Sequence, residues 1–186
     1  ILANSIKRLF ADFNTMEMAR QFELANEYEQ SVEFLKKEIL QAEEINAYAY
    51  KRSLLERALR LNIPEKSLTF LSFELIKTLY KLSDYKSTLE NIYRLSTARF
   101  SIDDKNQLQF IKACSLIGIR KTEEGKSIFL QLLSTVNDEK LKKKTLVELA
   151  YAEFDLNNID EAEDYCKKLL DDQKLQYEEK EKCYNL

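Results

Sequence analysis

The chain has 186 residues, enough for one ordinary domain or one compact helical array with a sizeable core. Hydrophobic residues make up 45% of it, which argues against disorder, and a net charge of −3 gives no electrostatic reason to expect nucleic acid or an anionic membrane as a partner. With only 2 Gly and 1 Pro, against average use of roughly 7% and 5%, the chain can form few tight β-turns. Leu, Lys, Glu and Ala dominate instead, so an all-α fold is predicted.

The sequence lacks the residue arrangements of several common enzyme mechanisms. Without His, neither a Ser-His-Asp nor a Cys-His arrangement can form, and a main zinc ligand is absent. Gly118 and Gly125 are the only glycines, so no phosphate-binding loop can be written. Adjacent carboxylates such as Asp103 and Asp104 do not face one another on a helix and are expected on solvated faces. We therefore expect no catalysis, no metal and no cofactor.

Cysteine usage bears on the compartment. Cys114, Cys166 and Cys183 are widely spaced and odd in number, unlike a disulfide framework. The first two fall on apolar helical positions, where buried and unreactive thiols are expected. A reducing, cytoplasmic compartment is favoured. Because the chain begins at Ile1 and not at Met, a trimmed signal and a secreted or periplasmic location stay open. No apolar run approaches the roughly 20 residues needed to span a bilayer, so membrane insertion is not expected.

The N-terminal third contains two helix starts and one strong break. Residues 1–13 carry apolar side chains at helical spacing, and Asn14-Thr15 then offers a helix cap. Residues 25–31 have the composition of a turn between two helices. From 31 to 61 there is no Gly, Pro or clear turn signal, so one long helix or two helices meeting near the middle are both open. Pro64 ends this segment and suits the start of the next helix.

From residue 67 onward the apolar pattern is regular and repeats. Thr88, Gly125 and Ala162 occupy one small-residue position, and successive members lie 37 residues apart. The same offset relates three further sets: Tyr85, Thr122 and Ile159; Ile92, Phe129 and Cys166; Leu95, Leu132 and Leu169. Each unit predicts two amphipathic helices joined by a tight turn, as at Asn157-Asn158, where Asn tolerates the left-handed conformation. Such a pair cannot bury its apolar face without neighbours, which indicates a helical repeat protein.

The stretch from Leu146 to Leu170, with Leu146-x-x-Leu149-Ala150 followed by Ala162, resembles one tetratricopeptide repeat. The resemblance implies one domain over 1–186, a right-handed α-solenoid of antiparallel helix pairs with about 9–10 helices. It places repeats at about 12–40 (the least regular), 68–98, 105–135 and 142–172, an extra or elongated helix at 41–63, and at 174–186 a capping helix or the start of a truncated repeat. The offset of 37 exceeds the family's repeat of about 34, and the usual Trp and Pro are missing. Another helical-pair solenoid or an irregular bundle are the alternatives.

In the resembling family, the first helix of each pair lines a concave groove that binds partners. Carried over by position, the groove residues are Phe73, Lys77, Tyr80, Gln107, Phe110, Cys114, Ile117, Val147, Tyr151 and Phe154. This aromatic and aliphatic wall suits an amphipathic helix or an extended peptide, although some of these side chains could instead pack between repeats. Asn is absent from these positions, so the Lys and Asn clamp with which some family members hold chaperone C-termini is not expected.

The resemblance thus implies a non-catalytic scaffold for a protein or peptide partner, with self-association through the end repeats as a further expectation. The alternative is a peptide-sensing regulatory domain of a larger protein, such as a transcription regulator. The one basic cluster is either a solvated face or a docking patch for an acidic partner, and without interleaved aromatic residues it does not suggest nucleic acid. It comprises Lys140, Lys142, Lys143 and Lys144.

Overall fold

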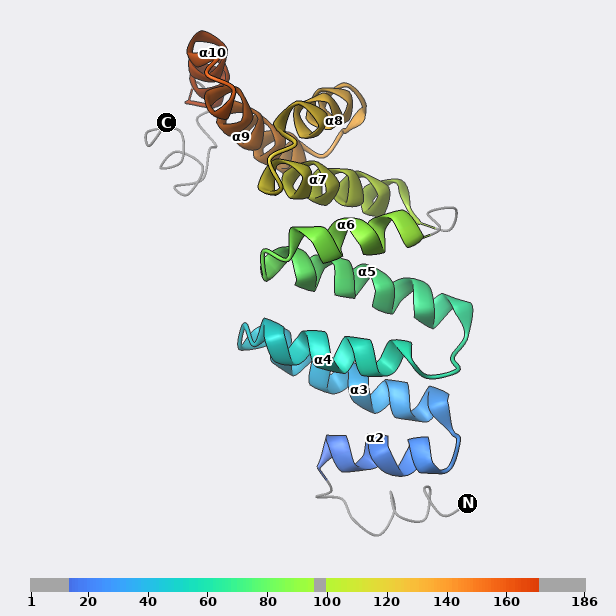
Figure 1. Cartoon of the computed structure of the whole chain (residues 1–186). Coiled ribbons are helices and arrows are strands. Elements are labelled where there is room, and N and C mark those ends of the chain that lie inside the picture. The colour runs from blue at the N-terminus through green and yellow to red at the C-terminus, as the bar shows by residue number, and fades with distance from the viewer. Residues whose placement is uncertain (1–13, 96–99, 171–186) are drawn as a thin grey trace. The chain divides into compact units, whose positions relative to one another are not determined.

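The computed structural model describes residues 14–95 and 100–170, and every regular element within them is an α-helix (Figure 1). The all-α prediction is confirmed. The chain divides into two units, the first ending at Leu82 and the second beginning at Ser83, and each is described separately. The predicted apolar segment at 1–13, the predicted capping helix at 174–186 and Cys183 lie outside the described residues. None of the described helices is long and apolar enough to cross a membrane.

The first unit contains α2 (Thr15–Leu24), α3 (Tyr28–Glu44), α4 (Tyr48–Leu59) and α5 (Glu65–Lys81). Each helix packs against the next, and the core between them is a continuous cluster of leucine, isoleucine, valine and alanine side chains. Fully burying one such large aliphatic side chain contributes about 1.5–3 kcal/mol to the free energy of unfolding. Because α3 ends at Glu44 and α4 begins at Tyr48, the segment from 31 to 61 is two helices and not one long helix.

The second unit contains α6 (Tyr85–Arg94), α7 (Ile102–Gly118), α8 (Thr122–Thr135), α9 (Glu139–Asp155) and α10 (Ile159–Leu170). Consecutive helices from α6 to α10 pack in sequence, and α7 also contacts α9. Gly125 lets α7 and α8 approach closely, because a Cβ atom at this position would lie 2.7 Å from the backbone oxygen of Ala113. The contact of α7 with α9 places the first helices of two successive pairs side by side.

Five turns share one backbone conformation, in which a residue with positive φ follows the helix. These residues are Asn26, Asn46, Ser83, Arg120 and Asn157, with φ between 54° and 66°. At Asn26, Asn46, Arg120 and Asn157 the next residue donates its N–H to the carbonyl oxygen five residues before it, at 2.8–2.9 Å. This is the Schellman arrangement, which satisfies carbonyl groups that the helix end leaves unpaired.

The helices and turns extend the 37-residue spacing beyond the three units seen in the sequence. Four helices of 17 residues, α3, α5, α7 and α9, begin at residues 28, 65, 102 and 139, which are 37 apart. The left-handed residues at 46, 83, 120 and 157 follow the same step. The pair α3–α4 is thus in register with the later pairs, while α2 precedes α3 through an additional turn. The repeat boundaries proposed from the sequence remain a prediction.

Arg120 is the position in these turns where a substitution should stabilise the protein. A side chain with a Cβ atom in the left-handed region is strained by roughly 1–2 kcal/mol, and glycine is not. Arg120→Gly is expected to raise the free energy of unfolding by about 0.5–1 kcal/mol, since greater freedom of the unfolded chain offsets part of the gain. Urea denaturation followed by circular dichroism measures it. Asn157→Gly, which replaces a residue that already tolerates this conformation, should change the stability less, and an equal gain in both variants would contradict the argument.

Candidate functional site

The predicted groove residues are distributed over α5, α7 and α9, as the register required. Those on α5 belong to the first unit and those on α7 and α9 to the second. Within each helix the predicted residues recur at spacings of three and four and therefore share one face. None of the described residues forms a group of three or more His, Cys, Asp or Glu side chains able to hold a metal ion.

In the first unit, lysine side chains lie over the aromatic rings of this face. Phe73 is buried, with 7% of its surface exposed, and the Lys77 ammonium lies 4.9 Å from its ring centroid. Lys36 of α3 lies 5.9 Å from the ring centroid of Phe70, which is exposed. Tyr80 is half-buried. Of the aromatic residues predicted here, Phe73 is therefore already covered, in part by a cation–π contact with Lys77 of modest strength.

A buried ion-pair network lies next to this face and was not predicted. Lys51 of α4 occupies the register position of Thr88, Gly125 and Ala162, and only 3% of it is exposed. Its ammonium contacts Glu43 of α3 and lies 2.9 Å from the Glu74 carboxylate of α5. The network thus joins three helices.

The charges of this network depend on one another. Burial acts to lower the pKa of Lys51, but the hydrogen bonds to Glu43 and Glu74 and their negative charges together raise it above its ordinary value. Burial likewise acts to raise the pKa of Glu74, and the hydrogen bonds from Lys77 and Lys51 outweigh it and lower that pKa. Both groups are therefore charged at neutral pH, and each stabilises the charged form of the other.

In the second unit, the α7–α9 face has an apolar half formed by the C-terminal parts of the two helices. Cys114 and Val147 are buried, as is the other described thiol, Cys166. Ile117 and Tyr151 are half-buried, and Phe154 is 45% exposed. The accessible apolar surface here comes from Tyr151 and Phe154, because the Ile117 side chain packs toward α8 beside Gly125. Tyr151 packs against a buried cluster that includes Val147.

Phe110, also predicted for this face, serves the packing of α7 against α8. Its ring lies 5.6 Å from that of Phe129, centroid to centroid, and Phe129 is fully buried. Glu153, missed by the sequence analysis, is 2% exposed and lies 2.8 Å from Lys126 of α8. It also accepts a hydrogen bond from the Asn158 side chain at 2.8 Å. The hydrogen bond to Glu153 raises the pKa of Lys126, although burial acts against it. This pair fastens α9 to α8 and fixes the orientation of the α9 side chains.

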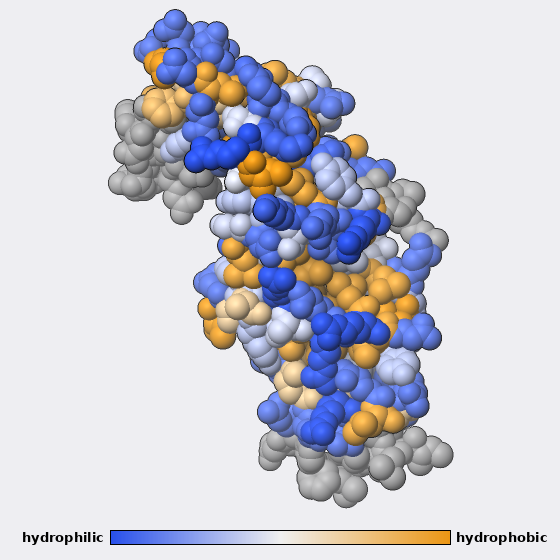
Figure 2. All heavy atoms as spheres, in the orientation of Figure 1, coloured by the Kyte–Doolittle hydropathy of each residue, from blue (hydrophilic) through white to orange (hydrophobic). Residues whose placement is uncertain are grey.

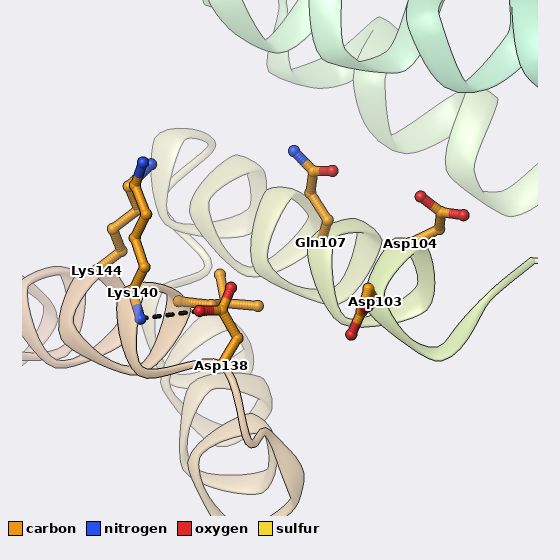
Figure 3. A pocket seen from close by; sticks show the side chains of 7 residues that line it. Asp103, Asp104, Gln107, Asp138, Lys140 and Lys144 are labelled. Atoms are coloured by element: carbon orange, nitrogen blue, oxygen red, sulfur yellow. Dashed lines mark hydrogen bonds between the residues drawn. The ribbon is translucent and has the colours of Figure 1, made fainter.

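The N-terminal parts of α7 and α9 form the polar half of the same face. A cavity of about 230 Å³ lies between them (Figure 3). It is lined by Asp103, Asp104, Gln107, Asp138, Lys140, Leu141 and Lys144. In Figure 3 the side chains of Lys140 and Lys144 extend in the same direction as that of Gln107. Gln107, predicted for the groove, and two lysines of the basic cluster thus line one cavity, a juxtaposition that the sequence alone did not predict.

On the face drawn in Figure 2, apolar and hydrophilic side chains are interspersed. In the view of Figure 2, apolar surface is interrupted by hydrophilic side chains and forms no single continuous apolar patch. Isolated exposed apolar residues are normal on protein surfaces and need no explanation. A partner of such a surface would have to match polar groups as well as apolar ones.

Paired α-helices joined by Schellman turns at a constant register define a tetratricopeptide-like helical repeat fold, and the predicted resemblance in fold to tetratricopeptide repeats is confirmed. Among solved structures, the chain is similar to YrrB, described as a TPR protein with an unusual peptide-binding site, with 16% identity, a TM-score of 0.64, and 98% of this chain and 97% of that chain covered.

It is also similar to MamA, residues 41 to the end, from Desulfovibrio magneticus RS-1. That match has 15% identity and a TM-score of 0.63, and covers 91% of this chain and 92% of that one. At these identities the likeness shows the fold alone. No protein-family model matches the sequence, and no curated protein is significantly similar to it.

Proposed function

We propose that the protein is a non-catalytic interaction scaffold that binds a segment of a partner protein on the α7–α9 face. The observation that carries the proposal is the accessible apolar surface of Tyr151 and Phe154 on α9, a helix that packs against α7, α8 and α10. Large aromatic side chains at the centre of a supported surface are the residues that most often dominate binding energy. Their position on the first helices agrees with where the resembling family binds its partners.

Two further features support this reading. The chain lacks His, and only two glycines occur in it, so the common catalytic and phosphate-binding arrangements cannot be built from it. The fold is shared with YrrB, whose structure is described as having a peptide-binding site. An apolar strip of this kind suits a short helix or an extended peptide anchored by a few large side chains.

Selection of peptides from a random display library on the immobilised full chain tests the proposal. Fluorescence anisotropy then gives the dissociation constant of a selected peptide for each variant. Tyr151→Ala and Phe154→Ala are each expected to weaken binding about tenfold or more, the effect typical of an interface anchor. Phe73→Ala is unsuited to this test, because Phe73 is buried and its truncation would mainly destabilise the fold.

Leu130→Ala is the matched control. Leu130 lies on α8 and is 44% exposed, compared with 45% for Phe154. Its substitution should leave the dissociation constant unchanged, and circular dichroism should show all variants folded. Recovery of no peptide, or equal loss of affinity in the Phe154 and Leu130 variants, would contradict a binding site on the α7–α9 face.

A further inference from the structure

The part of the chain that contains Tyr151 and Phe154 is strongly acidic. From Thr145 to Cys166 the sequence has seven Asp and Glu residues and no Lys or Arg. This interval covers the C-terminal part of α9, the turn after it and the first part of α10. On the N-terminal side, the nearest basic residue of α9 is Lys144, which precedes Tyr151 by seven residues, or about 10 Å along the helix. The basic cluster is therefore separate from the two aromatic residues.

Only some of these seven carboxylates are neutralised by lysines. Lys126 of α8 lies 2.8 Å from Glu153, and Lys167 lies 2.8 Å from Glu163. Four others are exposed, and within the described part of the chain no ion pair includes any of them. These four are Asp155, Asp160, Glu161 and Asp164. The hairpin formed by α9 and α10 thus has an excess of negative charge on its surface.

Asp155 lies next to the proposed binding surface. It follows Tyr151 by four residues and therefore lies on the same side of α9, directly after Phe154. Glu148, which has interactions of its own, is a second carboxylate within one turn of Tyr151. Asp155 is the last residue of α9, where a carboxylate opposes the negative end of the helix dipole, and the last turn of α9 has no basic residue. A cation beside Asp155 would offset this unfavourable placement.

The negative charges also act on a tyrosine of α10. Tyr165 and Tyr151 pack against the same buried cluster of side chains from α9 and α10. Burial raises the pKa of Tyr165, and the charge of Glu153 and, less strongly, that of Glu161 raise it further, although Lys126 acts to lower it. The acidic side chains of this hairpin therefore disfavour a further negative charge close to the proposed binding surface.

We infer that the segment bound on the α7–α9 face carries a lysine or arginine that pairs with Asp155, next to the apolar residue that contacts Tyr151 and Phe154. This inference rests on the proposed function and specifies the chemistry of its partner. Residues four apart on a helix have Cβ atoms about 5–6 Å apart, and an extended peptide advances about 3.3 Å per residue. The basic residue therefore lies within about two residues of the apolar one.

A double-mutant cycle on the full chain tests the inference. The probe is a library-selected peptide, synthesised with both ends blocked, in which each Lys or Arg is replaced in turn by Gln. Asp155→Asn should weaken binding of the parent peptide about three- to fivefold, and should have little effect on the peptide that lacks the paired charge. Asp164→Asn is the matched control, because it removes the same charge from an exposed position on α10, and it should leave the affinity unchanged.

Salt dependence and the selected sequences give further outcomes. Raising the salt from about 50 to 300 mM should weaken binding to the wild type more than to the Asp155→Asn variant, because the ion pair is exposed. Selected peptides without Lys or Arg near their apolar residue, or equal losses in the Asp155 and Asp164 variants, would overturn the inference. Binding that depends on Tyr151 and Phe154 but not on Asp155 would refute it while leaving the proposed function intact.

Discussion

Replacing Lys51 with methionine is expected to lower the free energy of unfolding of the protein by about 3 kcal/mol, the low end of the range for breaking a buried ion pair. Methionine fills most of the volume of the lysine stem, so the change mainly removes the charge. The Glu74 carboxylate, with 14% of its side chain exposed, then loses the partner that reaches it from α4. Urea denaturation followed by circular dichroism measures the effect.

Lys77→Met is the matched control for this prediction. Lys77 pairs with the same Glu74 carboxylate, but its side chain is 31% exposed. Exposed ion pairs typically contribute about 0–1 kcal/mol, so this variant should be much less destabilised. If Lys51→Met were as stable as the wild type, the network would not stabilise the packing of α3, α4 and α5.

The same network predicts how stability depends on pH. The pKa of Glu74 is lowered from 4.5, so its contribution is present above that value and is lost as the pH falls through the lowered pKa. The pKa of Lys51 is raised from 10.5, so its contribution is present below that value and is lost as the pH rises through the raised pKa. The contribution should be constant between these limits, and the alkaline loss should diminish in Lys51→Met.

Gly125→Leu is expected to destabilise the protein by about 3 kcal/mol, at the upper end of the range for overpacking a core. A Cβ atom at Gly125 would lie 2.7 Å from the backbone oxygen of Ala113 and 2.7 Å from Cγ1 of Ile117. The Ile117 side chain can move, but the Ala113 oxygen moves only if α7 moves. The helices α7 and α8 would therefore separate.

Two other variants define the origin of this effect. Gly125→Ala adds the same Cβ atom but gains about 1 kcal/mol of helix propensity, so its loss of stability should be smaller. Ser127→Leu places the larger side chain on the exposed surface of α8, where substitutions usually change stability by no more than about 0.5 kcal/mol. Thermal unfolding of the three variants distinguishes close packing from a general intolerance of leucine in α8. Similar losses in Ser127→Leu and Gly125→Leu would rule out the packing explanation.

The fold was readable from the sequence because its signals are local. Scarce Gly and Pro, apolar spacings of three and four, and the constant offset of Thr88, Gly125 and Ala162 suffice to predict paired helices. Whether a turn separates α3 from α4 stayed open from the sequence, because the small-residue position is occupied there by Lys51. Burial of that lysine depends on Glu74, which is 23 residues away in the sequence. A usable signal did exist, since Asn46-Ala47-Tyr48 repeats the pattern of Asn26-Glu27-Tyr28.

The candidate site was only partly predictable, because register gives the direction of a side chain but not what covers it. Tyr151 and Phe154 lie on the predicted face and are accessible, and Val147 on the same stripe is buried. The burial of Phe73 could not be predicted from the sequence, since one of the side chains that shield its ring from solvent is a lysine of the same helix, Lys77. Lys140 and Lys144 line the cavity between α7 and α9, whereas Lys142 pairs with Glu139. Residues so close in the sequence look alike in it, and only the direction of each side chain on the helix distinguishes them.

The equal length of α3, α5, α7 and α9 has an evolutionary consequence. Each of these helices starts at the same point of the 37-residue period and ends in a turn that fixes the direction of the chain. Gain or loss of 37 codons would therefore leave every remaining residue on its original helix face. A deletion of one or two codons inside a helix would instead turn all later side chains of that helix about the helix axis, by about 100° for each residue removed. Such a gene can change length in whole-period steps and still encode the same kind of packing.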